Sequence, residues 1–456
     1  MTSPFPLSLQ QAIEQLALGN LTSAQLTETA LKNIRDTEGE GSLAFTQVYE
    51  QWAREQAAAS SARRAANKAL SPIDGVPISI KDLFDVQGEA TTGGSRVLAD
   101  APAAAAHAEI VTRLLAAGAV IIGKTNMTEF AYSGLGINPH YGTPANPWDR
   151  ESRRIPGGSS SGAAVSVSDA MSFGAVGSDT GGSVRIPAAF CGLTGFKPTA
   201  RRISMAGVLP LSASLDSVGT IAHDVASCVA LDAAISGQPL SLTVKDLAAA
   251  HFAIPQTLVL DGLDEQVSSA FAAAIAALKQ AGAKISEIPL GEISELASIN
   301  ATGGFTALES WAWHKPLIAA RADGYDPRVV SRIRRGEPLG EKDRVQLVQQ
   351  RADWQQRISS KVQQYDALLM PTVPFIAPTI AELEADEETY FRVNGAALRN
   401  PSVINFLDGC AVSLPCQKSG AAPVGLMVAA LPMQDEALMS WAQEIERCLK
   451  SQDLNL

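Results

Sequence analysis

The first part of the chain spaces its apolar residues with the period of amphipathic helices. Two short helices are predicted at the start, because Ser8 and Thr22 each open an S/T-x-x-Q capping box, and Gly19 is placed to end the first helix. An alanine-rich stretch predicts a longer helix over residues 50–69, ended by Ser71-Pro72. We therefore expect helices throughout residues 1–70.

From residue 76 onward, short apolar runs alternate with segments of helical period. Buried strands are predicted at 76–80, 119–122, 367–370 and 424–428. Helices are predicted at 108–117, from 162 to about 169, and at 436–449. Strands that alternate with helices favour an α/β fold on a mostly parallel or mixed sheet.

The middle of the chain, residues 235–365, is more helical and more charged than the rest, as in RVVSRIRRGEPLGEKDRVQLVQQRADW (328–354). There is no internal repeat and no low-complexity linker that would separate independent domains. We therefore predict one domain over 1–456. Its parts are N-terminal helices (1–70), a core (75–220), a variable helical insertion (235–365) and a C-terminal part of the core (366–456).

Composition is that of an ordinary globular protein: 456 residues, 46% hydrophobic and 18% charged. The formal net charge of −11 argues against binding to nucleic acid or to an anionic membrane surface. No run of about 18 apolar residues is present that could span a membrane. The N-terminus lacks the basic and apolar regions of a signal peptide, so we expect a cytoplasmic protein.

Cysteine and histidine patterns give no metal framework. The five cysteines are widely spaced without a C-x-x-C pair, which suits a reducing compartment. The five histidines are scattered and include no H-E-x-x-H. We expect no metal site.

One stretch matches the phosphate-binding loop G-x-x-x-x-G-K-[ST] letter for letter, at GAVIIGKT (118–125). Its four middle residues, 119–122, are the apolar residues of a predicted strand. Their N–H groups would be committed to a sheet rather than to a phosphate. We therefore interpret this stretch as a buried strand, not as an ATP site.

A second literal match is G-x-S-x-G at Gly158–Gly162, with Ser160 in the place of the nucleophile of an α/β-hydrolase. A nucleophile elbow needs a hydrophobic strand directly before the serine. Here the preceding residues, ESRRIPG, are typical of a loop. None of the later histidines stands in a distinctive setting for a base. We expect a serine hydrolase in which Ser160 is not the nucleophile.

Two further stretches carry candidate chemistry. In GVPISIKD (75–82), strand alternation puts Lys81 on the face of Ser79, opposite Ile78 and Ile80. Lys81 is either a solvated strand end or, if buried, a base whose pKa is lowered. In GSDTGGSVRIP (177–187), successive N–H groups suit an oxyanion, with Ser183 beside them as a nucleophile; the alternative is a tight structural loop.

Together these stretches resemble the amidase signature family of serine hydrolases. The matching segments are GVPISIKD (75–82), GKTNMTEFAYS (123–133), NPWD (146–149), PGGSSSG (156–162) and GSDTGGSVRIPAAFCGLTGFKPT (177–199). Shorter matches follow at 365–374 and 423–430. The resemblance implies an α/β fold of three layers, α/β/α, in which helices flank a large mixed β-sheet core.

The family uses a Ser–cisSer–Lys triad. Carried onto this chain, the resemblance implies Ser183 as nucleophile, Ser159 as the bridging serine after a cis peptide bond, and Lys81 as base. It implies an oxyanion hole made by the N–H groups of Thr180, Gly181, Gly182 and Ser183. It implies an acyl side of the pocket lined by Ala131, Tyr132 and Ser133. No cofactor and no metal are required.

The chain departs from the common family pattern in places. Ser161 and Ala163 replace a glycine and a serine near the bridging serine, and neither position belongs to the triad. After KPT, Ala200-Arg201 replaces the common Tyr-Gly, which weakens any transfer of fine substrate specificity.

The resemblance implies an amidohydrolase that cleaves the C–N bond of a small or aryl carboxamide through an acyl-enzyme. The alternatives are the glutaminase subunit of a tRNA-dependent amidotransferase, a carbamate or urea-derivative hydrolase of the same family, and a catalytically dead binding protein. The KPTARR loop and RNPSVINFLDGCAVSLPC (399–416) favour a stand-alone enzyme. The expected partner is a small-molecule amide, with a homodimer left open.

Overall fold

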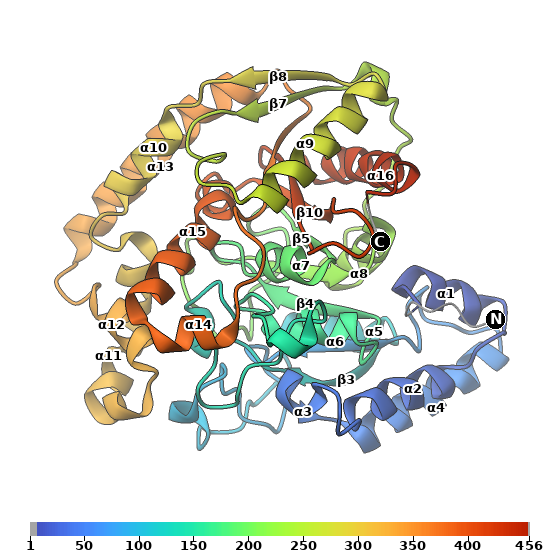
Figure 1. Cartoon of the computed structure of the whole chain (residues 1–456). Helices are drawn as coiled ribbons and strands as arrows, with labels where there is room; N and C mark the ends of the chain where they lie inside the picture. The colour runs from blue at the N-terminus through green and yellow to red at the C-terminus, as the bar shows by residue number, and fades with distance from the viewer. Residues whose placement is uncertain (1–6, 455–456) are drawn as a thin grey trace.

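One mixed β-sheet runs through the chain in the computed structural model, which describes residues 7–454. Within them, eleven strands are ordered β1-β3-β2-β4-β6-β5-β10-β11-β9-β7-β8, and they follow one another from β8 at the top of Figure 1 to β3 near the bottom. The strands are β1 (Phe45–Val48), β2 (Pro77–Lys81), β3 (Val120–Thr125), β4 (Gly174–Ser178), β5 (Thr194–Lys197), β6 (Val218–Ala222), β7 (His251–Pro255), β8 (Lys284–Ile288), β9 (Ala367–Pro371), β10 (Cys410–Pro415) and β11 (Gly425–Ala430). Strand β2 pairs in parallel with both β3 and β4.

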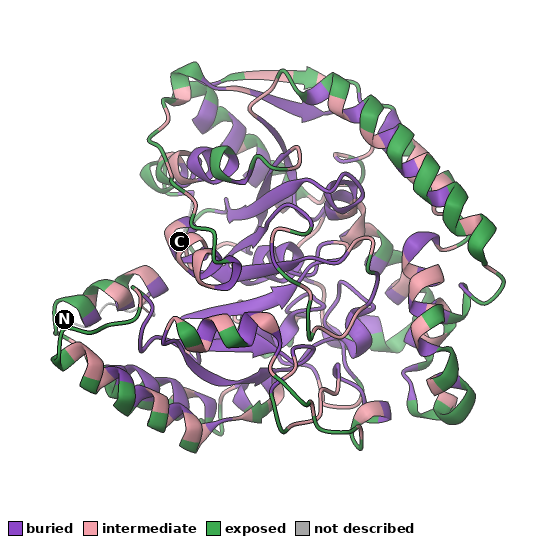
Figure 2. Cartoon of the chain, turned by 180° about the vertical axis from the view of Figure 1, so that it is seen from behind, coloured by how far each residue is buried: buried purple, intermediate pink, exposed green. Residues whose placement is uncertain are grey.

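Helices cover both faces of this sheet, which gives the expected three layers. One face packs against α5 (Glu109–Ala116), α8 (Val225–Ser236), α9 (Glu265–Gln280) and α16 (Asp435–Ser451). The other packs against α6 (Ser161–Ser168), α7 (Arg185–Cys191), α13 (Glu341–Val362) and α15 (Glu387–Phe406). Figure 2 shows the strands buried between these layers, while the outer helices expose one side.

The remaining helices lie around this core. They are α1 (Leu9–Ala17), α2 (Ser23–Ile34), α3 (Gly41–Ala44), α4 (Glu50–Ala65), α10 (Glu292–Ile299), α11 (Gly304–Arg321), α12 (Pro327–Arg334) and α14 (Ile380–Ala385). The capping boxes predicted at Ser8 and Thr22 are present and begin α1 and α2. Helix α4 ends at Ala65, earlier than predicted, because the chain turns at Asn67, whose φ is 55°.

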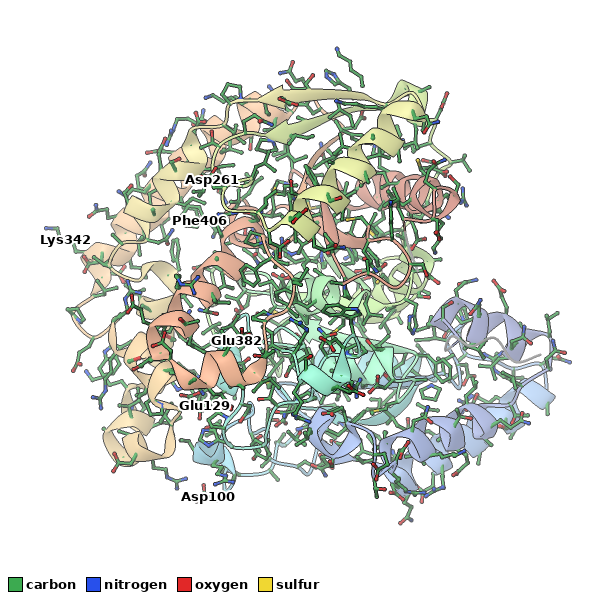
Figure 3. All side chains as sticks on the ribbon, in the orientation of Figure 1. Asp100, Glu129, Asp261, Lys342, Glu382 and Phe406 are labelled. Atoms are coloured by element: carbon green, nitrogen blue, oxygen red, sulfur yellow. The ribbon has the colours of Figure 1, made fainter. Side chains whose placement is uncertain are left out.

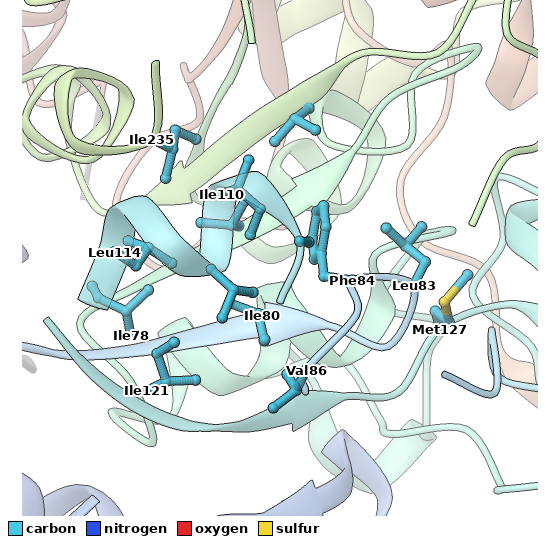
Figure 4. Close-up of a cluster of buried hydrophobic side chains, with 14 of the residues drawn as sticks. Ile78, Ile80, Leu83, Phe84, Val86, Ile110, Leu114, Ile121, Met127 and Ile235 are labelled. Atoms are coloured by element: carbon cyan, nitrogen blue, oxygen red, sulfur yellow. The ribbon is translucent and has the colours of Figure 1, made fainter. Parts of the chain in front are cut away.

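Strand β2 shows how sequence alternation places the chemistry. Ile78 and Ile80 point into a hydrophobic cluster with residues of α5 and α8, which Figure 4 shows around Ile110, Leu114 and Ile235. On the opposite face, Ser79 Oγ lies 2.9 Å from the hydroxyl of Ser166 in α6. The predicted division of this strand into two faces is confirmed, and Lys81 follows on the face of Ser79.

Strand β3 settles the letter match to a phosphate loop. It extends to Thr125, so Gly123, Lys124 and Thr125 are themselves strand residues rather than a loop. Lys124 is buried, and its Nζ lies 3.7 Å from Asp82 Oδ1. The interpretation as a buried strand is confirmed.

The segment 235–365 differs from its predicted description. It is helical over much of its length, but it also contains β7 and β8, which extend the sheet at one edge. Their apolar residues are short runs beside an alanine-rich helix, so the period of the sequence did not distinguish them. The predicted pair of late strands is present as β9 and β11, which are antiparallel neighbours.

Candidate active site

The site lies where the parallel strands β2 and β4 end. Lys81 is the last residue of β2, and Ser178 is the last residue of β4. The Nζ of Lys81 lies 2.7 Å from Ser159 Oγ and 2.8 Å from Ser178 Oγ. The carboxyl ends of parallel strands are the usual position of ligand sites in open α/β sheets. The structure therefore brings Lys81 and Ser159 together, as the sequence resemblance implies.

The loop before α6 presents Ser159 to the lysine. The Gly158–Ser159 peptide bond is cis, as expected. A Cβ at Gly158 would lie 2.5 Å from the backbone nitrogen of Gly136, so the close approach of these two loops requires glycine. The N–H of Ser160 donates to the carbonyl of Ser183 at 3.3 Å, which joins this loop to the one that carries the predicted nucleophile.

Ser160 itself has a supporting position. It directly precedes α6, and its hydroxyl donates to the carbonyl of Ser178 at 3.4 Å. It does not line the cavity described below. No regular strand precedes it, since residues 150–157 form a short 3-10 turn and irregular chain. These positions argue against a nucleophile elbow at Ser160.

Lys81 is fully buried, which changes its acid–base behaviour. Removal from water lowers the pKa of its ammonium to about 7, although the carboxylates of Asp179 and Asp216 act in the opposite direction. A lysine with this pKa is substantially neutral near pH 7. The structure thus supports the interpretation of Lys81 as a usable base and not as a solvated strand end.

The loop that carries Ser183 is shaped by the buried carboxylate of Asp179. Burial by itself would raise the pKa of Asp179, but the guanidinium of Arg185 holds that pKa well below its usual range. Arg185 donates to both carboxylate oxygens, at 2.9 and 3.0 Å, and Asn405 Nδ2 donates to Oδ1 at 2.8 Å. The same carboxylate accepts the backbone N–H groups of Gly182 and Val184. Asp179 therefore remains ionised and fixes the backbone between β4 and α7.

Three N–H groups of this loop remain free to bind an oxyanion. Those of Thr180, Gly181 and Ser183 meet no acceptor within residues 7–454. The N–H of Gly182 differs from the expectation, because it donates to Asp179 Oδ1 at 2.8 Å. Gly182 instead supplies the turn, with a φ of 128° that favours glycine.

A second buried carboxylate holds the other side of the loop. Thr180 Oγ1 donates to Asp216 Oδ1 at 2.5 Å, and the N–H groups of Leu211 and Ser212 donate to Asp216 Oδ2. Burial raises the pKa of Asp216 to about 6 in spite of these hydrogen bonds. Thr180 is thereby fixed from outside its own loop.

Ser183 lines a cavity of about 370 Å³. Its hydroxyl makes no hydrogen bond with any described residue, so it is free to face a ligand. The cavity lies beside α15, whose last residue, Phe406, is labelled in Figure 3. Much of the lining is apolar and includes Leu211, Leu215, Leu258, Ile293, Leu296, Leu398, Val403 and Phe406. Its size is typical of a site for a small organic molecule.

The predicted substrate segment also lines this cavity. Ala131, Tyr132 and Ser133 all belong to the lining, together with Thr180, Gly181 and Ser183. The hydroxyl of Ser133 donates to Asn394 Oδ1 at 2.9 Å, which attaches the segment to α15. Of the residues singled out by the sequence, only the buried Lys81, Ser159 and Gly182 do not line the cavity.

Several functional positions were not found by sequence reasoning. They are Ser178, Asp179, Arg185, Asp216 and Asn405. An aspartate before T-G-G-S is a known pattern for capping backbone N–H groups, so Asp179 had a local signal. Arg185 within the apolar run SVRIPAAF also signals a buried partner. Asn405 had none, because its contacts come from a segment more than 200 residues away.

The described part of the chain offers neither a metal-binding cluster nor a membrane-spanning helix. Among residues 7–454, no group of three or more His, Cys, Asp or Glu side chains is arranged to hold a metal ion. No helix in that range is both long and apolar enough to cross a membrane. All five cysteines are free thiols.

Comparison with known proteins gives matches over nearly the whole chain. The model of the Amidase family matches residues 25–439. The 2-amino-5-chloromuconic acid deaminase of Comamonas testosteroni is 33% identical over 96% of both chains. A subunit of the glutamyl-tRNA(Gln) amidotransferase of Chloroflexus aggregans is 32% identical over 98% of this chain and 97% of its own. A crystal structure of an amidase superposes with a TM-score of 0.87 at 28% identity, covering 98% of this chain and 100% of the other.

Proposed function

Because this chain belongs to the amidase family, whose members hydrolyse amide C–N bonds, we propose that it does so through an acyl-enzyme formed on Ser183. The observation that carries this proposal is the buried contact of 2.7 Å between Lys81 Nζ and Ser159 Oγ, next to the loop of Ser183. An amide is a poor electrophile with a poor leaving group. Its cleavage needs an activated nucleophile, a site for the oxyanion and a proton for the departing nitrogen.

Proton transfer starts at the lysine. Neutral Lys81 accepts the proton of Ser159, and Ser159 accepts the proton of Ser183 as Ser183 Oγ attacks the carbonyl carbon. Burial supports this role, because it brings the pKa of Lys81 to about 7, close to the pH at which a base is effective. Ser178, 2.8 Å from Lys81 Nζ, keeps the amine oriented.

The tetrahedral intermediate carries a negative charge on the former carbonyl oxygen. We assign its stabilisation to the free N–H groups of Thr180, Gly181 and Ser183, which belong to a loop fixed by Asp179 and Asp216. Donors held in place before the reaction need no reorganisation when charge develops. Gly182 is left out of this set because its N–H is engaged by Asp179.

Collapse of the intermediate breaks the C–N bond. The proton on Lys81 returns through Ser159 to the leaving nitrogen, which departs as an amine and leaves the acyl group on Ser183. Water then attacks the ester by the same relay and releases the carboxylic acid. The chain's own groups handle each proton and charge, so the route requires no cofactor.

The proposed substrates are small or aryl carboxamides, with carbamates and urea derivatives as the neighbouring class. The cavity of about 370 Å³ and its apolar lining suit a molecule of this size. The relative from Comamonas testosteroni, a deaminase of 2-amino-5-chloromuconic acid, acts on a molecule of comparable size. The test is hydrolysis by the purified chain of acyl anilides, aliphatic amides, glutamine and carbamates, without ATP or any partner. No turnover of any of them would contradict the proposal of a stand-alone amidase.

The second candidate is the glutaminase subunit of an amidotransferase. The match to the amidotransferase subunit of Chloroflexus aggregans over 98% of this chain favours it. A subunit of this kind would release ammonia from glutamine and would need partner subunits to use it. Glutamine as the only substrate cleaved, with activity dependent on added partners, would support this second function over the first.

A further inference from the structure

The cavity beside Ser183 has an unusual charge for this protein. Three arginines line it, Arg332 and Arg335 at the end of α12 and Arg399 on α15, and no aspartate or glutamate is among its lining residues. The chain as a whole has a net charge of −11. Positive charge is therefore concentrated at the site of a chain that is acidic as a whole. Such a local potential attracts anions.

None of these guanidinium groups forms an ion pair with a carboxylate anywhere in residues 7–454. Neighbouring arginines show that pairing is the rule in this region. Arg328, on the same helix α12, pairs with Asp326 at 2.8 Å, and Arg351 pairs with Asp408 at 2.8 Å. The absence of an acidic partner is thus specific to the arginines that face the cavity.

The protein holds these arginines in place by neutral contacts only. The guanidinium of Arg332 lies 4.6 Å above the ring of Tyr132 and donates to the backbone carbonyl of the same residue. Arg335 donates to the carbonyl of Ala301 at 3.0 Å, and Arg399 donates to Asn400 Oδ1 at 3.0 Å. A guanidinium has five N–H donors, so each of the three retains donors for a ligand.

Arg332 is the central member of this set. Desolvation lowers its pKa, and the nearby positive charge of Arg335 acts in the same direction. Two guanidinium groups near each other with no acid between them repel, and an anion placed between them relieves that repulsion. The contact with Tyr132 puts Arg332 next to the segment that lines the cavity together with Ser183.

We propose that Arg332 and Arg335, with Arg399 across the cavity, form an anion subsite that selects amides carrying a carboxylate group. This inference rests on the proposed function, since it names the substrate class of the same site. The apolar residues between the arginines and Ser183 accommodate the carbon skeleton, and the arginines bind the carboxylate through charge-assisted hydrogen bonds. The alternative is a group of ordinary solvated arginines at a cavity mouth, which would give no preference for anions.

The first test measures equilibrium binding to the Ser183→Ala variant, so that no turnover is required. The probes are succinanilic acid, with a carboxylate on the acyl side, 4-butyramidobenzoate, with one on the amine side, and uncharged butyranilide. We expect at least one charged probe to bind at least about tenfold more tightly than butyranilide. This difference should shrink between about 50 and about 500 mM NaCl, because salt screens charge attraction. Which charged probe is preferred shows on which side of the amide the carboxylate lies.

The second test introduces arginine variants into the same background. Arg332→Gln and Arg335→Gln should each remove most of the preference for the charged probe and leave butyranilide binding within about twofold. Arg332→Lys, which keeps the charge but not the planar fork, should recover part of the preference. The matched control is Arg334→Gln, an exposed arginine of the same helix that does not line the cavity, and it should change nothing. Thermal unfolding of each variant identifies any loss of fold.

The outcomes separate this inference from the proposed function. Equal binding of charged and uncharged probes, or a preference that survives Arg332→Gln and Arg335→Gln, overturns the anion subsite, whatever the wild-type enzyme hydrolyses. Tight, arginine-dependent binding of a charged probe together with no hydrolysis by the wild-type chain would instead retain the subsite and contradict the amidase proposal.

Discussion

The Nζ of Lys81 lies 2.7 Å from Ser159 Oγ, and both residues are fully buried. Burial of an amine without a carboxylate within ion-pair distance favours its neutral form, which is the form that can remove a proton. The carboxylates of Asp179 and Asp216 act on Lys81 only from a distance, because each is engaged in its own hydrogen bonds. The charge state of the site is therefore set by desolvation, and it leads to direct predictions.

The nucleophile can be identified by covalent labelling. Ser183→Ala should abolish labelling by a fluorophosphonate probe and lower kcat by at least about 10³-fold, because no other hydroxyl is free on the cavity wall next to the N–H groups. Ser160→Ala is the control and should retain labelling. If Ser183→Ala is still labelled and Ser160→Ala is not, the assignment is wrong.

The pH dependence of kcat/KM reports on the base. With a pKa of about 7, Lys81 loses its proton as pH rises, so the rate should increase about tenfold per unit below pH 7 and level off above it. Lys81→Ala should lower activity by roughly 10²–10⁴-fold and flatten this acid limb. An acid limb that is unchanged in Lys81→Ala would mean that another group is the base.

The same lysine should reduce stability at low pH. Its pKa is about 7 in the folded chain and near the ordinary value of 10.5 when unfolded, so the unfolded state binds more protons between these pH values. The destabilisation is fully present below pH 7 and is relieved as pH rises toward 10.5. The Lys81→Met variant lacks this dependence. We therefore expect its free energy of unfolding to exceed that of wild type by the most at pH 6, by a few kcal/mol, with the gap narrowing toward pH 9.

Urea unfolding of both proteins at pH 6, 7.5 and 9 measures this gap. Lys124→Met provides a comparison, since Lys124 is a buried lysine that lies near the carboxylate of Asp82. A gap between wild type and Lys81→Met that stays constant or widens from pH 6 to 9 would contradict a lowered pKa at Lys81.

Asp179 should act on catalysis through the position of the loop. Asp179→Asn leaves the buried guanidinium of Arg185 without a carboxylate, and we expect a loss of about 3–5 kcal/mol in stability. It also weakens the acceptor of the Gly182 N–H, so kcat should fall more than KM rises. Kinetics below the unfolding temperature of the variant separate the two effects. A variant with lower stability and an unchanged kcat would show that Asp179 is only structural.

The turn at Gly182 should not tolerate a side chain. An alanine Cβ there would lie 2.6 Å from Pro401 Cβ and 2.7 Å from the end of Ile186, at a φ of 128° that L residues rarely adopt. Gly182→Ala should therefore displace the N–H groups beside it and lower kcat by roughly 10²-fold or more, the scale seen when an oxyanion donor is lost. Gly291→Ala, where a Cβ has open space, is the matched control. Full activity in Gly182→Ala would contradict the assigned role of this loop.

Local features of the chain were predictable because they depend on near neighbours. The capping boxes at Ser8 and Thr22, the two faces of β2 and the strand at residues 119–122 follow from residue type and spacing alone. The strands β7 and β8 were not predicted, since five-residue apolar segments beside helices have no distinctive period. Their place in the sheet is decided by pairing with β9, which is far along the chain.

The sequence by itself determined which residues carry the chemistry, because glycine-rich loops and a lysine at a strand end keep their order and spacing in one segment, 75–199. Only the tertiary structure decided how these residues behave. It buried Lys81 and so lowered its pKa, engaged the N–H of Gly182 with Asp179, and brought Asn405 to the nucleophile loop. It also assembled three unpaired arginines around one cavity from α12 and α15. Desolvation and charge pairing depend on groups that meet in space from distant parts of the chain, and no local pattern encodes such meetings.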